Sequence, residues 1–191
     1  MACLLQSNRA VFLDRDGVII EEKVFIHNPD DVILINGAAE AIKRLSSMRL
    51  RVIVVTNQSG IGRGLFLKED YQKVEERIDS LLRRSGASID VSYYCPHAPR
   101  EDCNCRKPRP GMAFQAVRDL NVDLSGSFVV GDKRSDMEFA RAIGAKGILV
   151  RTGYGRNTEL EGKPVWDVVA DSIEDAVGFI GKWIGEEDNG K

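Results

Sequence analysis

Two carboxylates stand at the end of an apolar run near the start of the chain. Asp14 closes the run 10–14 in the segment VFLDRDGVI, and Asp16 and Gly17 follow it. Residues two apart in an extended chain point to the same side, so both carboxylates are expected to face one pocket. Two acids held together repel each other, which favours a bound cation, a shared proton or both. A solvated turn or a calcium loop is the alternative for this segment alone.

A cluster of hydrogen-bond donors follows a second apolar run. The segment VVTNQSG (54–60) carries Thr56, Asn57, Gln58 and Ser59. A hydroxyl and several amides at the end of a strand can bind an oxyanion. The same residue types are also typical of a capped turn, so this segment by itself leaves both interpretations open.

A fixed positive charge is available in the segment CRKPRPG (105–111). Arg106, Lys107 and Arg109 lie in this stretch, which two prolines stiffen. A cation held beside paired carboxylates would neutralise a phosphate group or a phosphorylated aspartate. A basic surface loop is the alternative.

A second pair of acids occurs in VVGDKRSDM (129–137). Asp132 ends an apolar run, and Asp136 lies four residues further on. Mg²⁺ prefers oxygen ligands, so Asp132 is suited to bind the ion directly and Asp136 to bind it from behind the direct ligands or through a water molecule. The alternative for Asp136 is an acid in the first turn of a helix, where the helix dipole favours negative charge.

Three of the four cysteines crowd around a histidine. Cys95, His97, Cys103 and Cys105 form the pattern C-x-H-x5-C-x-C. Three thiolates and one imidazole suit a tetrahedral Zn²⁺ in a closed structural site. A disulfide between Cys103 and Cys105, or a set of unconnected thiols, are the alternatives. A structural zinc here would pin the loop and so position the basic residues that follow it.

Short apolar runs alternate with amphipathic segments along the chain. Strands are expected at 10–14, 51–56, 91–95, 127–132, 146–152 and 167–170. Helices are expected at 37–48, 68–86, 110–120, 135–144 and 172–184. The alternation predicts a mainly parallel sheet in one α/β domain over residues 1–191, with the cysteine loop 95–105 inside it. Sites of such sheets lie at the carboxyl ends of the strands, where Asp14, Thr56 and Asp132 stand.

Composition narrows the class of protein. The chain is 43% hydrophobic and 29% charged, with a formal net charge of -2, so neither a nucleic acid nor a membrane is expected as partner. No apolar stretch reaches the roughly 18 residues of a membrane span. The opening MACLLQSNRA has too short an apolar run for a signal peptide. A cytoplasmic protein with reduced thiols is therefore expected.

The four groups of polar residues resemble a known superfamily when their order is considered. Acids, hydroxyl, lysine and acids follow one another, which is similar to the haloacid dehalogenase superfamily of phosphotransferases. LDRDGVI, VTNQSGIGRG, YYCPH, CNCRKPRPGM and VGDKRSDM further resemble its heptose bisphosphate and histidinol-phosphate phosphatases. The resemblance implies a Rossmannoid three-layer sandwich. The spacing leaves no room for a large cap domain, so the loops 20–30 and 58–66 are expected to close the site.

The resemblance also implies roles for the residues. Asp14 would be the nucleophile that carries phosphate, and Asp16 the general acid and base. Mg²⁺ would be held by Asp14, Asp132 and the backbone carbonyl of Asp16, with Asp136 behind them. Thr56, Asn57 and Lys107 would hold phosphate oxygens. The further candidates for contact with substrate are Gln58, Ser59, Arg63, Arg106 and Lys133, and the implied zinc ligands are Cys95, His97, Cys103 and Cys105. His27 is left open between a substrate contact and a turn.

The substrate implied by the resemblance is a seven-carbon sugar with two phosphates, which loses the phosphate at C7. A monomer that supplies heptose for surface glycans is implied with it. Histidinol phosphate is the alternative substrate, and Glu21 and Glu22 would suit its ammonium group. The alternatives of other classes are a receiver domain that is phosphorylated on aspartate, and a non-catalytic module that zinc stabilises.

Overall fold

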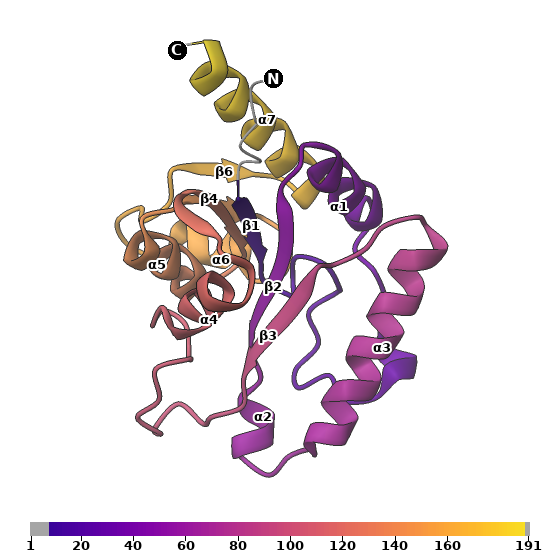
Figure 1. Ribbon diagram of the computed structural model, residues 1–191. Helices are drawn as coiled ribbons and strands as arrows, with labels where there is room; N and C mark the ends of the chain where they lie inside the picture. The colour runs from indigo at the N-terminus through magenta and orange to yellow at the C-terminus, as the bar shows by residue number, and fades with distance from the viewer. Residues whose placement is uncertain (1–7, 190–191) are drawn as a thin grey trace.

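The computed structural model describes residues 8–189, which form a parallel sheet with helices on both faces (Figure 1). The opening segment 1–7, with Cys3, lies outside the described residues. The strand order is β3-β2-β1-β4-β5-β6, and every pair of neighbours is parallel. The strands are β1 (Arg9–Leu13), β2 (Arg51–Asn57), β3 (Val91–Cys95), β4 (Asp123–Gly131), β5 (Lys146–Val150) and β6 (Val168–Ala170).

Each of the five predicted helices is present, with two short helices and a 3-10 turn besides. The helices are α1 (Ala38–Ser47), α2 (Ser59–Gly62), α3 (Lys68–Arg84), α4 (Gly111–Leu120), α5 (Arg134–Ile143), α6 (Gly155–Leu160), α7 (Ile173–Asn189) and the 3-10 turn η1 (Pro29–Asp31). The prediction that the last helix ends at 184 was wrong, since α7 continues to Asn189. A single glycine at 185 weakens a helix by only about 1 kcal/mol, and the glutamates that follow are good helix formers.

Strand alternation divides the core into two layers. In β1, Val11 and Leu13 pack into one hydrophobic cluster, whereas Ala10 and Phe12 pack into the other. The first cluster includes apolar side chains of α1, α3 and α7, and the second includes those of α4 and α5. Figure 1 shows these two groups of helices on opposite sides of the sheet. The three-layer α/β sandwich predicted above is thereby confirmed.

The order of the strands fixes where a site can form. β1 lies between β2 and β4, so the connections that leave β1 and β4 pass to opposite halves of the sheet. Parallel sheets bind ligands at such a switch point, outside the carboxyl ends of the strands. The backbone N–H of Asp14 donates to the carbonyl of Val130, 3.0 Å away, which brings the end of β1 beside the end of β4.

The connections around the site are short. Between Gly17 and β2 the chain forms only η1, α1 and the loops beside them, and between β2 and Lys107 it forms α2, α3, β3 and loops. The described residues therefore contain no large cap domain, as expected. No helix within residues 8–189 is both long and apolar enough to cross a bilayer.

Candidate active site

A polar cavity of about 260 Å³ opens at the carboxyl ends of β1, β2 and β4. Its wall includes residues of all four predicted motifs. The predicted closing loop 20–30 contributes residues 22–26, and the predicted loop 58–66 contributes Gln58 and Ser59. The predicted site residues that line it are Asp14, Asp16, Thr56, Asn57, Gln58, Ser59, Arg106, Lys107, Lys133 and Asp136. Segments that lie far apart in the sequence thus meet at one edge of the sheet.

A buried lysine joins the first motif to the last. The Nζ of Lys107 lies 3.0 Å from Oδ1 of Asp14 and 2.7 Å from Oδ1 of Asp136, and it donates to the carbonyl of Val55 at 2.7 Å. Burial acts to lower the pKa of Lys107, but Asp136 and Asp14 outweigh it and raise that pKa. Burial likewise acts to raise the pKa of Asp14, but the charges of Lys107 and Lys133 and the hydrogen bonds to Asp14 together outweigh it and lower that pKa. Asp14 is therefore ionised near neutral pH.

One carboxylate oxygen of Asp132 accepts no hydrogen bond. Asp132 is completely buried, and its Oδ2 accepts a hydrogen bond of 2.8 Å from the backbone N–H of Tyr154, whereas its Oδ1 accepts none. Burial and the charge of Asp14 raise the pKa of Asp132 to about 8. The Nζ of Lys133 lies 3.6 Å from this Oδ1, too far for a hydrogen bond, and its charge only partly offsets the burial of Asp132. A cation bound at Oδ1 would supply the rest of the compensation.

The acids around this oxygen suit a metal ion. One carboxylate oxygen from each of Asp14, Asp132 and Asp136 lies within 4.8 Å of the others. Asp136 also accepts from the backbone N–H of Lys133 at 3.0 Å in the first turn of α5, so the alternative considered for it is observed in a residue that belongs to the acid cluster as well. Three converging carboxylates form a hard oxygen donor set of the kind that Mg²⁺ prefers. The residues therefore fit a divalent cation.

Amide and hydroxyl groups at the end of β2 are already engaged with their neighbours. The Nε2 of Gln58 donates to Oδ2 of Asp16 at 2.9 Å and to Oγ1 of Thr56 at 2.8 Å. The side chain of Asn57 bonds to the backbone of Lys107. These contacts tie the second motif to the first and the third.

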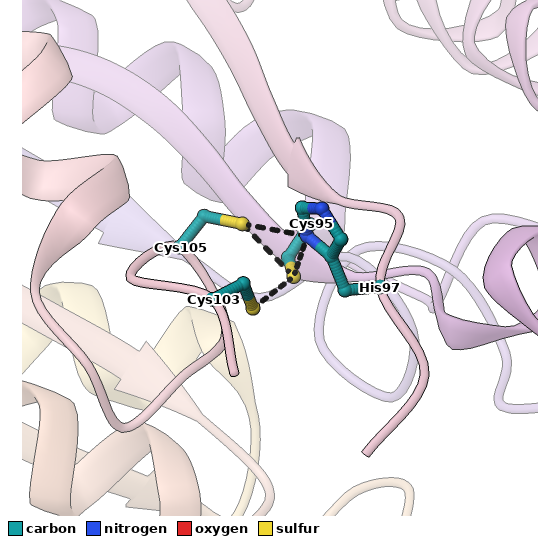
Figure 2. A group of neighbouring side chains, drawn as sticks. All are labelled: Cys95, His97, Cys103 and Cys105. Atoms are coloured by element: carbon teal, nitrogen blue, oxygen red, sulfur yellow. Dashed lines mark hydrogen bonds between the residues drawn. The ribbon is translucent and has the colours of Figure 1, made fainter. Parts of the chain in front are cut away.

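The cysteines and the histidine converge beyond the end of β3 (Figure 2). The Sγ of Cys105 lies 3.1 Å from Sγ of Cys95 and 3.2 Å from Nδ1 of His97, and Cys103 Sγ lies 3.6 Å from Cys95 Sγ. All three thiols are free, so the disulfide alternative is excluded in this structure. Ligands about 2.3 Å from a tetrahedral zinc would lie roughly 3.7 Å apart, close to the spacing found here. The group can hold a metal ion.

Two predicted residues lie away from the cavity. Arg63 is exposed, and its guanidinium stacks on the ring of Phe25, 5.6 Å from the centroid. His27 is also exposed, and its Nδ1 lies 2.8 Å from the carbonyl of Phe25 while its ring stacks on Phe66. For His27 the structure therefore favours the turn over the substrate contact.

Sequence reasoning missed residues that support the acids. A Cβ on Gly153 would lie 2.2 Å from Oδ2 of Asp132 and 2.7 Å from Cα of Gly17, and the hydroxyl of Thr152 donates to the carbonyl of Gly17 at 2.6 Å. The segment RTGYG follows β5 at the same edge of the sheet. Its place after a predicted strand could have identified Thr152 and Gly153 as residues near the site. The buried Arg15 gave no comparable signal. Glu22, considered above only for histidinol phosphate, lines the cavity and pairs with Lys133 at 2.7 Å.

Comparisons with known proteins agree with this geometry. A family model described as "HAD-hyrolase-like" matches residues 104–176. The D-glycero-beta-D-manno-heptose-1,7-bisphosphate 7-phosphatase of Photorhabdus laumondii subsp. laumondii is 44% identical over 167 residues, or 83% of this chain and 88% of that protein. The protein of the same name from Escherichia coli (strain K12) is 39% identical over 188 residues, or 94% of this chain and 97% of that protein.

Solved structures give the same result. The D,D-heptose 1.7-bisphosphate phosphatase from B. bronchiseptica, complexed with magnesium and phosphate, superposes with a TM-score of 0.86. It is 34% identical, and the match covers 92% of this chain and 99% of that one. Because both the sequence and the fold match along nearly the whole length, the chain belongs to the D-glycero-beta-D-manno-heptose-1,7-bisphosphate 7-phosphatase family of HAD-like hydrolases.

Proposed function

We propose that the protein is a Mg²⁺-dependent phosphatase that removes the C7 phosphate of D-glycero-β-D-manno-heptose 1,7-bisphosphate. The observation that carries the proposal is the buried Asp14 carboxylate, paired with Lys107 at 3.0 Å beside Asp132 and Asp136, at the edge of a polar cavity. The names of the relatives supply the substrate. The proposal covers one domain that acts as a monomer in the cytoplasm.

The reaction proceeds by two displacements at phosphorus. An oxygen of Asp14, which needs no base because it is already ionised, forms a bond to phosphorus as the ester bond to O7 of the sugar breaks. Asp16 gives its proton to the departing O7. Asp16 then takes a proton from the water that attacks phosphorus, and the bond between phosphorus and Asp14 breaks. The products are inorganic phosphate and the sugar 1-phosphate.

The remaining residues bind and orient the phosphates. Lys107, with Thr56 and Ser59, contacts the oxygens of the reacting phosphate. Arg106 lines the cavity with its Nη1 buried and without a hydrogen-bond partner, which suits it to the second phosphate, and Lys133 lines the same cavity. In the same proposal, Gln58 orients Asp16, and Asn57 orients Lys107. Arg63 affects the substrate only through Phe25, a residue of the cavity wall on which its guanidinium stacks.

Two metal ions complete the proposal. Asp14, Asp132 and the backbone carbonyl of Asp16 would hold Mg²⁺, with Asp136 behind them. Bound Mg²⁺ supplies the positive charge that offsets repulsion between the Asp14 carboxylate and the phosphate. Cys95, His97, Cys103 and Cys105 would hold a structural Zn²⁺.

A phosphate-release assay tests the proposal. Purified protein is given the β and α anomers of the heptose bisphosphate and histidinol phosphate, with Mg²⁺ and then with a chelator. We expect multiple turnovers, the highest kcat/KM with the β anomer, and no release by Asp14→Asn. A higher kcat/KM with histidinol phosphate would overturn the substrate, and a single turnover would indicate a phosphorylated receiver instead.

A further inference from the structure

The largest fully buried side chain in the described part of the chain is a charged one. Arg15 stands between the two motif acids and is only 1% exposed. Removing a guanidinium from water costs several kcal/mol unless charged partners replace the lost hydration. The contacts that keep Arg15 in this position therefore indicate what it does.

One edge of the Arg15 guanidinium holds Asp16. Its Nε donates to Oδ2 of Asp16 and its Nη2 donates to Oδ1, each at 3.1 Å. A bidentate pair of this kind fixes the plane of the carboxylate as well as its position. Asp16 follows the end of β1 and precedes the turn at Gly17, so the backbone alone would hold its side chain less firmly. The other donor to Asp16 is the amide of Gln58.

The other edge of the guanidinium is anchored on a helix. The Nη1 of Arg15 donates to Oε1 of Glu75 at 3.0 Å, and the ring of Tyr71 lies 5.4 Å from its central carbon. Both partners belong to α3, one turn apart. That helix packs against the sheet through Val74, Ile78 and Leu82. Arg15 thus connects a rigid helix to the carboxylate of Asp16.

We infer that Glu75 and Arg15 are positioning residues that hold the Asp16 carboxylate for proton transfer to the leaving group and from the attacking water. The inference rests on the proposed function, since it assumes that Asp16 carries this proton. Neither residue need contact the substrate. Glu75 does not line the cavity, and its hydrogen bond to Arg15 connects it to Asp16. The backbone N–H of Arg15 also donates to Oδ1 of Asp14, so the test must separate an effect on Asp16 from an effect on the nucleophile.

The test compares two leaving groups. The sugar alkoxide must receive a proton as it departs, whereas 4-nitrophenolate leaves as a stable anion and needs none. The comparison uses kcat/KM, which reports the steps up to departure of the leaving group and excludes the later attack of water, a step that both substrates share. For Glu75→Ala we expect kcat/KM with the heptose bisphosphate to fall about 10-fold, a part of the roughly 10²- to 10⁴-fold that a positioned general acid contributes. With 4-nitrophenyl phosphate we expect kcat/KM to change by less than about 2-fold.

Matched variants separate positioning from folding. Glu76→Ala, which removes the neighbouring exposed acid, should change neither rate, and Glu75→Gln should restore most of the lost activity because it keeps the acceptor for Arg15. Arg15→Lys should show the same selective loss as Glu75→Ala. If Arg15→Lys does not fold, Glu75→Ala carries the test by itself. Equal losses of kcat/KM with both substrates in Glu75→Ala would mean a merely structural role and would overturn the inference.

The variant Asp16→Asn tests the proposed function separately from this inference. If Asp16→Asn lost kcat/KM selectively with the sugar substrate but Glu75→Ala did not, the inference would be refuted and the proposed function would stand. If Asp16→Asn lowered kcat/KM equally with both substrates, the role of Asp16 as proton donor in the proposed function would fail, and the inference with it.

Discussion

Asn57 and Lys107 are joined by two reciprocal hydrogen bonds. The backbone N–H of Lys107 donates to Oδ1 of Asn57 at 3.0 Å, and Nδ2 of Asn57 donates to the carbonyl of Lys107 at 3.2 Å. The end of β2 is thereby fastened to the loop that carries the buried cation. A side chain that sequence reasoning assigned to phosphate binding is thus also the support for Lys107.

Removing this support should reduce the rate more than the affinity. In Asn57→Ala the backbone of Lys107 loses both hydrogen bonds, and its Nζ should drift from the position that stabilises the transferring phosphate. We expect kcat to fall roughly 10²-fold, as on loss of one donor to a developing oxyanion, with KM changed much less. Steady-state kinetics at saturating Mg²⁺ measures this. Asn157→Ala, which changes an exposed residue of α6, is the control, and kcat equal to the parent's in Asn57→Ala would contradict the prediction.

The sheet and the motif positions were predictable because they rest on short-range patterns. Apolar runs that end in Asp14, Thr56 and Asp132 identified three neighbouring strands, and parallel strands must bring their carboxyl ends to one edge. The short helices α2 and α6 were not predicted, since four and six residues are too few to show a helical period.

Contacts within the site could not be predicted in the same way. The pairing of Arg15 with Glu75 spans 60 residues, and its geometry depends on how α3 packs on the sheet. Arg63 was assigned to substrate from its place in a glycine-rich loop, but the structure places it outside the cavity, stacked on Phe25. Loop conformation decides such contacts, and loops lack the periodicity that identifies helices and strands.

Gly153 should prove necessary for metal binding. It adopts a φ of +56°, and an added Cβ would fall 2.2 Å from Oδ2 of Asp132, so Gly153→Ala must displace that buried carboxylate. Loss of support for a metal ligand lowers metal affinity about 10- to 100-fold. Mg²⁺ binding should raise the melting temperature of the protein. We expect Gly153→Ala to need about 10- to 100-fold more Mg²⁺ than the parent for half of this rise.

A second glycine provides the control for Gly153→Ala. Gly178 lies within α7, and nothing stands within 4 Å of a Cβ added there. Gly178→Ala should leave the Mg²⁺ dependence unchanged and stabilise the protein by about 0.5–1 kcal/mol. An unchanged Mg²⁺ midpoint in Gly153→Ala would show that Asp132 tolerates the shift.

Arg151 should stabilise the fold in a pH-dependent manner. Its guanidinium donates to both carboxylate oxygens of Glu159 at 2.7 and 2.8 Å, and to Oδ1 of Asp171 at 2.7 Å. These hydrogen bonds lower the pKa of Glu159 and the pKa of Asp171. A lowered pKa in the folded state contributes stability above the unfolded value, about 4.3 for Glu and 3.9 for Asp, which is lost as the pH falls through the folded value.

Thermal unfolding of Arg151→Gln measures this contribution. The melting temperature of the variant should lie below that of the parent at pH 7 and approach it as the pH falls below about 4. Arg84→Gln, at the exposed end of α3, should show a small difference that does not change with pH. A gap between parent and Arg151→Gln that widens toward acid pH would contradict the assigned pKa directions.

The cysteine group should make catalysis depend on zinc as well as on magnesium. Cys105 immediately precedes Arg106 and Lys107, and the carbonyl of Cys95 accepts a hydrogen bond of 2.8 Å from the backbone N–H of Gln58. Without a central ion, three thiols and an imidazole would hold this loop only by weak mutual hydrogen bonds. The placement of Lys107 should then be lost together with the metal.

Elemental analysis and kinetics of Cys103→Ser check this dependence. We expect about one zinc per chain in the parent and none in the variant. Structural zinc contributes about 10–16 kcal/mol in small zinc-binding peptides, so the melting temperature should fall by about 10 °C or more. In the chelated parent, Mg²⁺ alone should not restore the rate, whereas Zn²⁺ followed by Mg²⁺ should. Asn104→Ala, within the same loop, should keep its zinc and its rate. A zinc-free Cys103→Ser protein with the parent's kcat would show that the loop holds Lys107 in place unaided.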